Sequence, residues 1–283
     1  MQTVHHVPEL KVAVARLRAD GARIALVPTM GALHAGHIAL VDAARRTGAK
    51  VVASIFVNPK QFGPNDDLAR YPRPAEADAA VLAANGCDVL WMPAESEIYP
   101  AGFGTTVSVS GPSDGLDGAA HPGHFDGVAT IVTKLFNQVR PDLAVFGEKD
   151  FQQLAVIRRM VVDLDQGLEI IGVPTVREPD GLALSSRNTY LNPDERRRAS
   201  ALPRALHTAK RAIEAGQNDA IEEARAALAA AGFVTDYVEL VDAASLGPPI
   251  AGRARQLLAA ARMGTTRLID NVPVEPKIVV KSR

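Results

Sequence analysis

A short run near the N-terminus carries the residue types that bind and stabilise phosphate. It reads Pro28-Thr29-Met30-Gly31-Ala32-Leu33-His34-Ala35-Gly36-His37 and follows an apolar segment. His34 and His37 are three residues apart on the incoming turn of a predicted helix, so both side chains can face one anion. Gly36 has no Cβ and lets a ligand approach the backbone closely. Between a strand and a helix, the free N–H groups and the helix dipole of such a run favour phosphate.

Two common devices for holding a nucleotide are missing from the sequence. It has no Gly-Lys dipeptide, which excludes a Walker-type loop, and it lacks the glycine pattern of dinucleotide-binding folds. The histidine motif also has an ordinary interpretation as two partly exposed histidines. Its position between an apolar run and a helical pattern favours a phosphate site.

Four further polar clusters stand near predicted strand or helix ends. Alone, each reads as a strand-end turn, a helix cap at Asp150 or a hydroxyl-rich loop. They are residues 58–62 (NPKQF), 121–128 (HPGHFDGV), 147–153 (GEKDFQQ) and 184–188 (LSSRN).

Alternating strand and helix patterns must position these clusters. The order strand, helix, strand predicts an α/β fold, with a parallel sheet and helices on both faces. Ligands of such sheets bind outside the carboxyl ends of the strands. The predicted strands are residues 23–27, 51–57, 88–92 and 143–146, and the predicted helices are residues 38–47, 75–85, 128–139 and 151–164.

The glycine-rich stretch of residues 102–127 interrupts this alternation. It encloses one alternating run, residues 105–110. The run indicates a small surface hairpin, whereas the length and glycine content of the stretch are typical of a mobile cover over a site. Both interpretations stay open at this point.

The pattern changes after Pro174 and predicts a smaller α+β domain that begins near Val176. Asn192 followed by proline and two acids is a typical helix start, and Pro203 should kink or split the helix that follows. A second helix is predicted over residues 219–231, with Asp219 and Glu222 at capping-box spacing. Strands are predicted over residues 234–241, 256–263 and 266–272.

Composition narrows the classes of function. The 283 residues include 31 basic and 32 acidic side chains, which gives a net charge of −1 and excludes a broad basic face for nucleic acid. A single cysteine, Cys87, excludes a disulfide framework and a cysteine-based zinc site. No apolar run reaches the roughly 18 residues of a membrane span, and the first ten residues resemble no secretory signal. We therefore expect a cytoplasmic protein without membrane or nucleic-acid partners.

Together with the histidine motif, the four clusters closely resemble the pantothenate synthetase (pantoate–β-alanine ligase) family of the His-x-Gly-His nucleotidyl transferases. The resemblance runs from about Val27 to Asn192 and continues weakly to Asn271. It implies a Rossmann-like ATP- and pantoate-binding domain over residues 1–175. It also implies a smaller C-terminal domain over residues 176–283 that closes over the active site, and a homodimer.

The same resemblance implies a reaction. (R)-Pantoate and β-alanine would condense to pantothenate through a pantoyl adenylate, while ATP is cleaved to AMP and diphosphate in the presence of Mg²⁺. Gln61 and Gln153 would bind pantoate, with Gln61 also near β-alanine, and His37 would act as proton donor. The implied catalytic residues are His34, His37, Lys149, Ser185, Ser186 and Arg187. The implied ATP-binding residues are Met30, Gly31, His34, Gly36, His37, Gly147, Glu148, Lys149, Asp150, Val176, Leu184, Ser185, Ser186 and Arg187.

These residue types suit the chemistry. Charge grows on the phosphoryl oxygens when a carboxylate attacks the α-phosphorus, and Lys149, Arg187 and the imidazoles supply cations and donors there. Neutral amides suit the hydroxyls of pantoate. Mg²⁺ would bridge the phosphates on few protein ligands, which the sequence does not identify. Glu76 and Asp78 either assist this metal or form a solvated helix face. His121 stands where the family usually has arginine, so an imidazole replaces a permanent cation at that position.

The main alternative is another adenylate-forming nucleotidyl transferase of the same superfamily. It would share the histidine motif and the serine–arginine loop, but has no reason to carry Gln61 and Gln153. A regulatory module without activity would have no need of intact His37 and Lys149. An aminoacyl-tRNA synthetase would need a basic surface that the charge total does not support.

Overall fold

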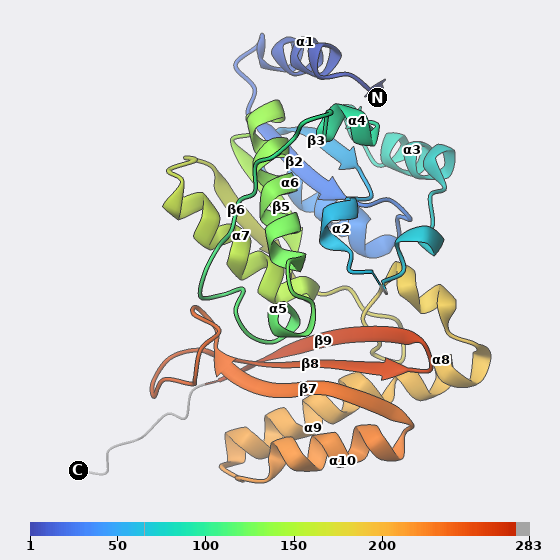
Figure 1. The fold of residues 1–283 in the computed structure, drawn as a ribbon, viewed down its shortest axis with the longest axis vertical. Helices are drawn as coiled ribbons and strands as arrows, with labels where there is room; N and C mark the ends of the chain where they lie inside the picture. The colour runs from blue at the N-terminus through green and yellow to red at the C-terminus, as the bar shows by residue number, and fades with distance from the viewer. Residues whose placement is uncertain (65, 276–283) are drawn as a thin grey trace.

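The computed structural model describes residues 1–64 and 66–275. Its larger sheet has six parallel strands in the order β1-β4-β3-β2-β5-β6 (Figure 1). This arrangement confirms the predicted α/β class. The strands are β1 (Gln2–Val4), β2 (Ile24–Thr29), β3 (Lys50–Ile55), β4 (Val89–Trp91), β5 (Leu143–Gly147) and β6 (Glu169–Val173).

Helices cover both faces of this sheet, because alternate residues of each buried strand point to opposite sides. In β2, Ile24 and Leu26 face one apolar cluster, whereas Ala25 and Val27 face the other. The helices α1 (Val7–Arg18), α6 (His124–Val139) and α7 (Phe151–Asp163) pack on the first face. On the second face lie α2 (Ala35–Arg46) and α3 (Ala75–Ala84).

The strand order creates a switch point between β2 and β5. From β2 the chain moves to β3 and β4 on one side, and it then returns to β5 on the other side. Crossovers that leave in opposite directions open a crevice at the carboxyl ends of the two strands. The histidine motif follows β2, and residues 147–153 begin at the end of β5, so the strongest sequence signal and one of the four clusters flank this crevice.

A second, antiparallel sheet lies below the first in Figure 1, in the order β7-β8-β9. Helices pack on its outer face, and residues such as Leu258 and Ala260 on the inner face contact Leu116 and Phe151 of the larger unit. The strands are β7 (Phe233–Asp242), β8 (Arg255–Met263) and β9 (Thr266–Val274), and the helices are α8 (Pro193–Ala199), α9 (Ala201–Ala215) and α10 (Ala220–Ala230).

The helix starts in this part were predicted with mixed success. Asn192 Oδ1 accepts hydrogen bonds from the N–H groups of Asp194 and Glu195, which confirms the predicted cap. The predicted split also occurs, but it falls at Ser200. Pro203 itself sits in the first turn of α9, where a missing N–H breaks no helical bond. The capping box at Asp219 is wrong, because its side chain makes no capping hydrogen bond.

The predicted hairpin over residues 105–110 is also wrong, because these residues form no strand. The segment runs along α6 instead: Val107 donates its N–H to Thr130 Oγ1 at 2.9 Å, and Val109 is buried in the same cluster as α6. The alternation of apolar and polar residues over 105–110 therefore results from packing of this segment against α6. Sequence patterns also missed β1, α1 and β6.

Short elements complete the chain. They are α4 (Glu95–Ile98), α5 (Asp117–Ala120), and the 3₁₀ turns η1 (Pro59–Gln61), η2 (Leu68–Arg70), η3 (Glu148–Asp150) and η4 (Ser186–Tyr190). Over the described residues, none of the helices has the length and apolar character that crossing a membrane requires.

Candidate active site

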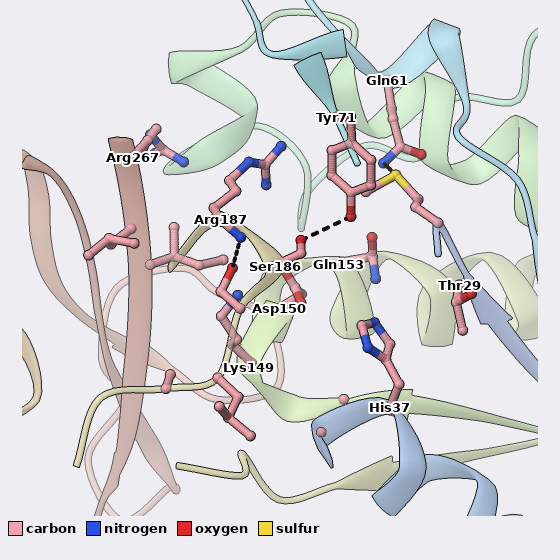
Figure 2. A pocket seen from close by; sticks show the side chains of 18 of the residues that line it. Thr29, His37, Gln61, Tyr71, Lys149, Asp150, Gln153, Ser186, Arg187 and Arg267 are labelled. Carbon is pink, nitrogen blue, oxygen red and sulfur yellow. Dashed lines mark hydrogen bonds between the residues drawn. The ribbon is translucent and has the colours of Figure 1, made fainter. Parts of the chain in front are cut away.

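A cavity of about 350 Å³ opens at the crevice and is walled by both sheets (Figure 2). The smaller sheet contributes β9 to the cavity wall, including Arg267 and Ile269. Nearly all the site residues expected from the sequence meet here. Those that line the cavity are Met30, His34, Gly36, His37, Gln61, Gly147, Lys149, Asp150, Gln153, Val176, Leu184, Ser185, Ser186 and Arg187.

Gly31 does not line the cavity and instead shapes the turn before the histidines. Its φ is +82°, a conformation that residues with a Cβ rarely adopt, and an added Cβ would lie 3.0 Å from Asp78 Oδ2. Asp78 itself is 3% exposed, and its carboxylate accepts the N–H groups of Ala32 and Leu33. Both expectations for Asp78, a metal assistant or a solvated helix face, are therefore wrong, whereas Glu76 is exposed.

Glu148 is the second expected residue outside the cavity lining. Its carboxylate lies beside Gly172 of β6, within 3.0 Å of the place where a Cβ of that glycine would stand. The backbone carbonyls of Glu148 and Lys149 accept hydrogen bonds from Asn271 Nδ2, each at 2.9 Å. Since Asn271 belongs to β9, the smaller sheet fixes the turn that carries Lys149.

The backbone fixes the orientation of both motif histidines. The N–H of His34 donates to His37 Nδ1 at 3.2 Å, and the N–H of Gly36 donates to His34 Nδ1 at 3.1 Å. A backbone N–H can only donate, so each Nδ1 is an acceptor and each neutral ring carries its proton on Nε2. The two rings lie 4.2 Å apart between centroids, and both line the cavity.

Burial keeps these imidazoles neutral. It lowers the pKa of His34 to about 4, with nearby Lys149 acting in the same direction. Burial also lowers the pKa of His37 to about 3, helped by His34 and Lys149. Without ligand, the two histidines therefore offer neutral N–H donors, and the positive charge of the site comes from Lys149 and Arg187.

Arg187 is the main cation of the serine–arginine loop, and it is paired. Its Nε and Nη2 each lie 2.9 Å from a carboxylate oxygen of Asp67. Burial raises the pKa of Asp67, but the bonds from Arg187 outweigh this and leave the pKa below its ordinary value. A phosphate that binds Arg187 must share it with Asp67.

Ser186 and Tyr71 join the loop to the opposite wall of the cavity. Their hydroxyl oxygens lie 3.2 Å apart, as the dashed line in Figure 2 shows. Val176 and Leu184 face the same space because the N–H of Leu184 donates to the carbonyl of Val176 at 3.0 Å.

The two glutamines expected to hold substrate line the cavity from different elements. Gln61 ends η1, and its Nε2 lies 3.2 Å from Met30 Sδ. Gln153 lies in the first turn of α7 and points into the same space in Figure 2. Its neighbour Gln152 turns away and is 3% exposed, because its amide holds residues 112–117 through Pro112, Gly115 and Asp117.

The glycine-rich stretch reaches the cavity at Asp117, His121 and His124. His121 Nε2 lies 3.8 Å from Asp66 Oδ1, so this histidine faces an acid across the opening. Asp117 contacts Arg267 Nη2 at 2.5 Å, and Arg267 Nε also contacts Asp236 at 2.6 Å. These pairs join the stretch to the smaller sheet.

Several lining residues were missed by sequence analysis, chiefly Asp67, Tyr71, Asp117 and Arg267. Asp67 and Tyr71 lie in a segment without a recognisable motif, and their place depends on a contact with Arg187 about 120 residues away. Arg267 offered a signal, because it is a charged residue inside a predicted strand.

The described residues contain no group of three or more histidine, cysteine or acidic side chains arranged to hold a metal. Asp150 is exposed and lines the cavity. One carboxylate beside a phosphate site suits Mg²⁺, which keeps most of its water and binds chiefly to the phosphates.

Comparisons with known proteins identify the family of this chain. A family model described as pantoate-beta-alanine ligase matches residues 2–273. The pantothenate synthetase of Rhizorhabdus wittichii is 62% identical over 281 residues, which is 98% of this chain and 99% of the relative. The crystal structure of the Thermus thermophilus pantothenate synthetase is 48% identical, with a TM-score of 0.91, over 98% of this chain and 100% of that one.

A third relative was solved with ligands. The Francisella tularensis pantoate-β-alanine ligase, complexed with beta-gamma ATP and β-alanine, is 33% identical, with a TM-score of 0.83. The similarity covers 96% of this chain and 97% of that one. With a family match along nearly its whole length and close relatives of the same kind, the chain belongs to the pantoate–β-alanine ligase family.

Proposed function

We propose that this protein joins (R)-pantoate to β-alanine, with cleavage of ATP to AMP and diphosphate. The observation that carries the proposal is the meeting of four sequence clusters around one cavity at the switch point of the sheet. Phosphate-binding elements and neutral amides stand within the same space there. The family relationship supports the same substrates.

The reaction proceeds in two balanced steps. A carboxylate oxygen of pantoate attacks the α-phosphorus of ATP, the bond to the bridging oxygen breaks, and diphosphate leaves with that electron pair. The amine of β-alanine then attacks the acyl carbon of the pantoyl adenylate. The C–O bond to AMP breaks, the amine loses a proton, and pantothenate and AMP are formed.

The side chains divide this work by their chemistry. His34 and His37 donate Nε2–H groups to phosphoryl oxygens, while Lys149 and Arg187 supply positive charge and Ser185 and Ser186 supply hydroxyl donors. Gln61 and Gln153 hold pantoate. The nucleotide is enclosed by Met30, Gly36, Gly147, Asp150, Val176 and Leu184. Gly31 and Glu148 do not line the cavity and instead belong to the turns that carry the histidines and Lys149.

Mg²⁺ would accompany ATP, with Asp150 as the carboxylate that faces it. When bound, the ion would neutralise charge on the phosphates. Arg187 and Lys149 supply the positive charge that comes from this chain.

We further propose a division into residues 1–175 and 176–283, with the second part closing over the cavity. The two separate sheets and the lining contributed by β9 support it. We also propose that the enzyme is a homodimer in the cytoplasm. Light scattering during gel filtration tests whether the enzyme is a homodimer. Cell fractionation tests whether it is in the cytoplasm.

One assay tests the proposed reaction. Purified protein receives ATP, Mg²⁺, pantoate and β-alanine, and AMP and pantothenate are measured. Omission of β-alanine should leave a pantoate-dependent exchange of labelled diphosphate into ATP. Release of ADP would indicate an acyl phosphate and contradict the proposal, and so would exchange without pantoate.

A further inference from the structure

We infer that Tyr99, which is not among the residues that line the cavity, positions Gln61 through Asn58, so that Gln61 presents an N–H donor to the substrate. The inference rests on the proposed function, because it takes pantoate as the molecule bound at Gln61. Three side chains carry it: Asn58 and Gln61 stand at the two ends of η1, and Tyr99 follows α4. In each hydrogen bond between these side chains, only one assignment of donor and acceptor is possible.

The direction is set first at Asn58, which is 1% exposed. Its Oδ1 accepts the backbone N–H of Lys60 at 3.3 Å, and its Nδ2 donates to the carbonyl of Gly127 at 3.0 Å. Because a backbone N–H only donates and a carbonyl only accepts, these two bonds determine which end of the amide is oxygen.

The second N–H of Asn58 transfers this direction to Gln61. It donates to Gln61 Oε1 at 3.0 Å, so the oxygen of Gln61 is engaged by Asn58. The nitrogen end then lies beside Met30 Sδ, at the wall of the cavity (Figure 2). A sulfur is a weak acceptor, which leaves the amide N–H groups of Gln61 available for a stronger one.

Tyr99 makes the shortest hydrogen bond of this network. Its hydroxyl donates to Asn58 Oδ1 at 2.7 Å, while the competing bond from Lys60 is long. The ring is held against Phe56 and Phe103, at centroid distances of 6.1 and 5.0 Å. Burial raises the pKa of Tyr99, which keeps the hydroxyl protonated and able to donate.

The arrangement has a consequence for specificity. The substrate atom next to Gln61 must accept a hydrogen bond, as the carboxylate and hydroxyl oxygens of pantoate do. An analogue that carries an ammonium group at that position is rejected, because the ammonium and the N–H of Gln61 are both donors and cannot form a hydrogen bond.

Tyr99→Phe tests the inference by removing one oxygen and keeping the ring. Pantoate-dependent exchange of labelled diphosphate into ATP gives KM for each substrate. We expect KM for pantoate to rise about tenfold, the scale of one buried hydrogen bond, with KM for ATP unchanged. Phe103→Leu is the matched control, because it disturbs the same ring cluster and leaves the hydroxyl bond in place. It should lower Tm without changing KM for pantoate.

A double substitution shows whether Tyr99 acts through Gln61. In a Gln61→Ala background, Tyr99→Phe should have no further effect on KM for pantoate. Additive effects would overturn the inference, and so would an unchanged KM for pantoate in the single variant or an equal rise for both substrates. Wild-type protein without pantoate-dependent exchange would refute the proposed function and, with it, this inference. An active wild type with an unaffected Tyr99→Phe variant refutes the inference alone.

Discussion

The carboxylate of Asp78 holds the turn that leads into the histidine motif, although 45 residues separate Asp78 from Leu33. Oδ2 accepts the N–H of Ala32 at 2.8 Å, and Oδ1 accepts the N–H of Leu33 at 2.9 Å. This bidentate contact connects α3 to the loop after β2. It fixes the path of the backbone just before His34.

Asp78→Asn should therefore weaken both the fold and the first half-reaction. The new amide sets its NH₂ against one of the two N–H donors, and leaving that buried donor unpaired costs about 1–3 kcal/mol. Urea unfolding measures the loss of stability, and diphosphate exchange measures the loss of rate. Glu76→Gln, two residues earlier on the same helix and exposed, is the control and should behave as wild type. Wild-type stability of Asp78→Asn would show that the contact is dispensable.

Gln61→Ala and Gln153→Ala should impair the use of pantoate far more than the binding of ATP. Both amides line the cavity outside the histidine motif and the serine–arginine loop, and a buried substrate hydroxyl left unpaired costs about 1–3 kcal/mol. Separate titrations of pantoate and ATP, followed by calorimetry, measure the two affinities. An equal loss for both ligands would contradict the assignment.

The order of elements could be predicted because each buried strand is a short apolar run and each helix shows its own spacing. The motifs after β2 and β5 could be placed for the same reason, since parallel strands bring their carboxyl ends to one edge. The edge strand β6 was missed because its apolar run of Ile170, Ile171 and Val173 is short and interrupted by Gly172, and most of its residues are only partly buried.

Contacts between distant segments could not be predicted in this way. Asp78 looked like any acid on an exposed helix, and only the fold brings it to Ala32 and Leu33. Tertiary structure likewise determines the pairing of Arg187 with Asp67 and the hydrogen bond from Asn271 to the carbonyl of Lys149. Charge states belong to this class too, because the low pKa of His37 results from burial that no local pattern reveals.

Acid should destabilise the fold through the two motif histidines. Their native pKa values are lowered to about 4 and about 3, below the value of roughly 6.5 expected in the unfolded chain. As the pH falls below about 6.5, the unfolded chain binds more protons than the native one, so the free energy of unfolding decreases. Well above a pH of about 6.5, these two histidines do not make the free energy of unfolding depend on pH. Urea unfolding at pH 7.5 and pH 5 measures this, and a His34→Gln/His37→Gln variant should lose less stability on acidification. A variant as acid-sensitive as the wild type would show that other groups are responsible.

Binding of ATP and pantoate should slow hydrogen exchange in residues 111–124. This part of the glycine-rich stretch contributes Asp117 and His121 to the cavity, and a shielded site protects the adenylate from water. Residues 105–110 lie against α6 and serve as the internal control, because they should exchange equally with and without ligands. Mass spectrometry of deuterated peptides resolves the two parts. Identical uptake in residues 111–124 under both conditions would refute a covering role.

His37→Ala should slow the diphosphate-exchange half-reaction by a factor of about 10²–10³, the usual cost of removing one donor from a developing oxyanion. His37 lines the cavity with its Nδ1 occupied by the N–H of His34, so only the Nε2–H is available to the phosphoryl group. Tm should stay within a few degrees of wild type. The second half-reaction, started from synthetic pantoyl adenylate, should suffer less, since attack at the acyl carbon needs less help at phosphorus.

Two amide replacements of His37 separate its two ring nitrogens. The amide nitrogen of glutamine reaches the place of Nε2, whereas that of asparagine reaches only the place of Nδ1. His37→Gln should therefore keep more exchange activity than His37→Asn if donation from Nε2 is the function of this residue. Equal loss in both variants would favour transfer of a proton, which neither amide performs. Near-normal exchange in His37→Ala would show that this histidine only supports the turn, and that Lys149 or Arg187 stabilises the transition state.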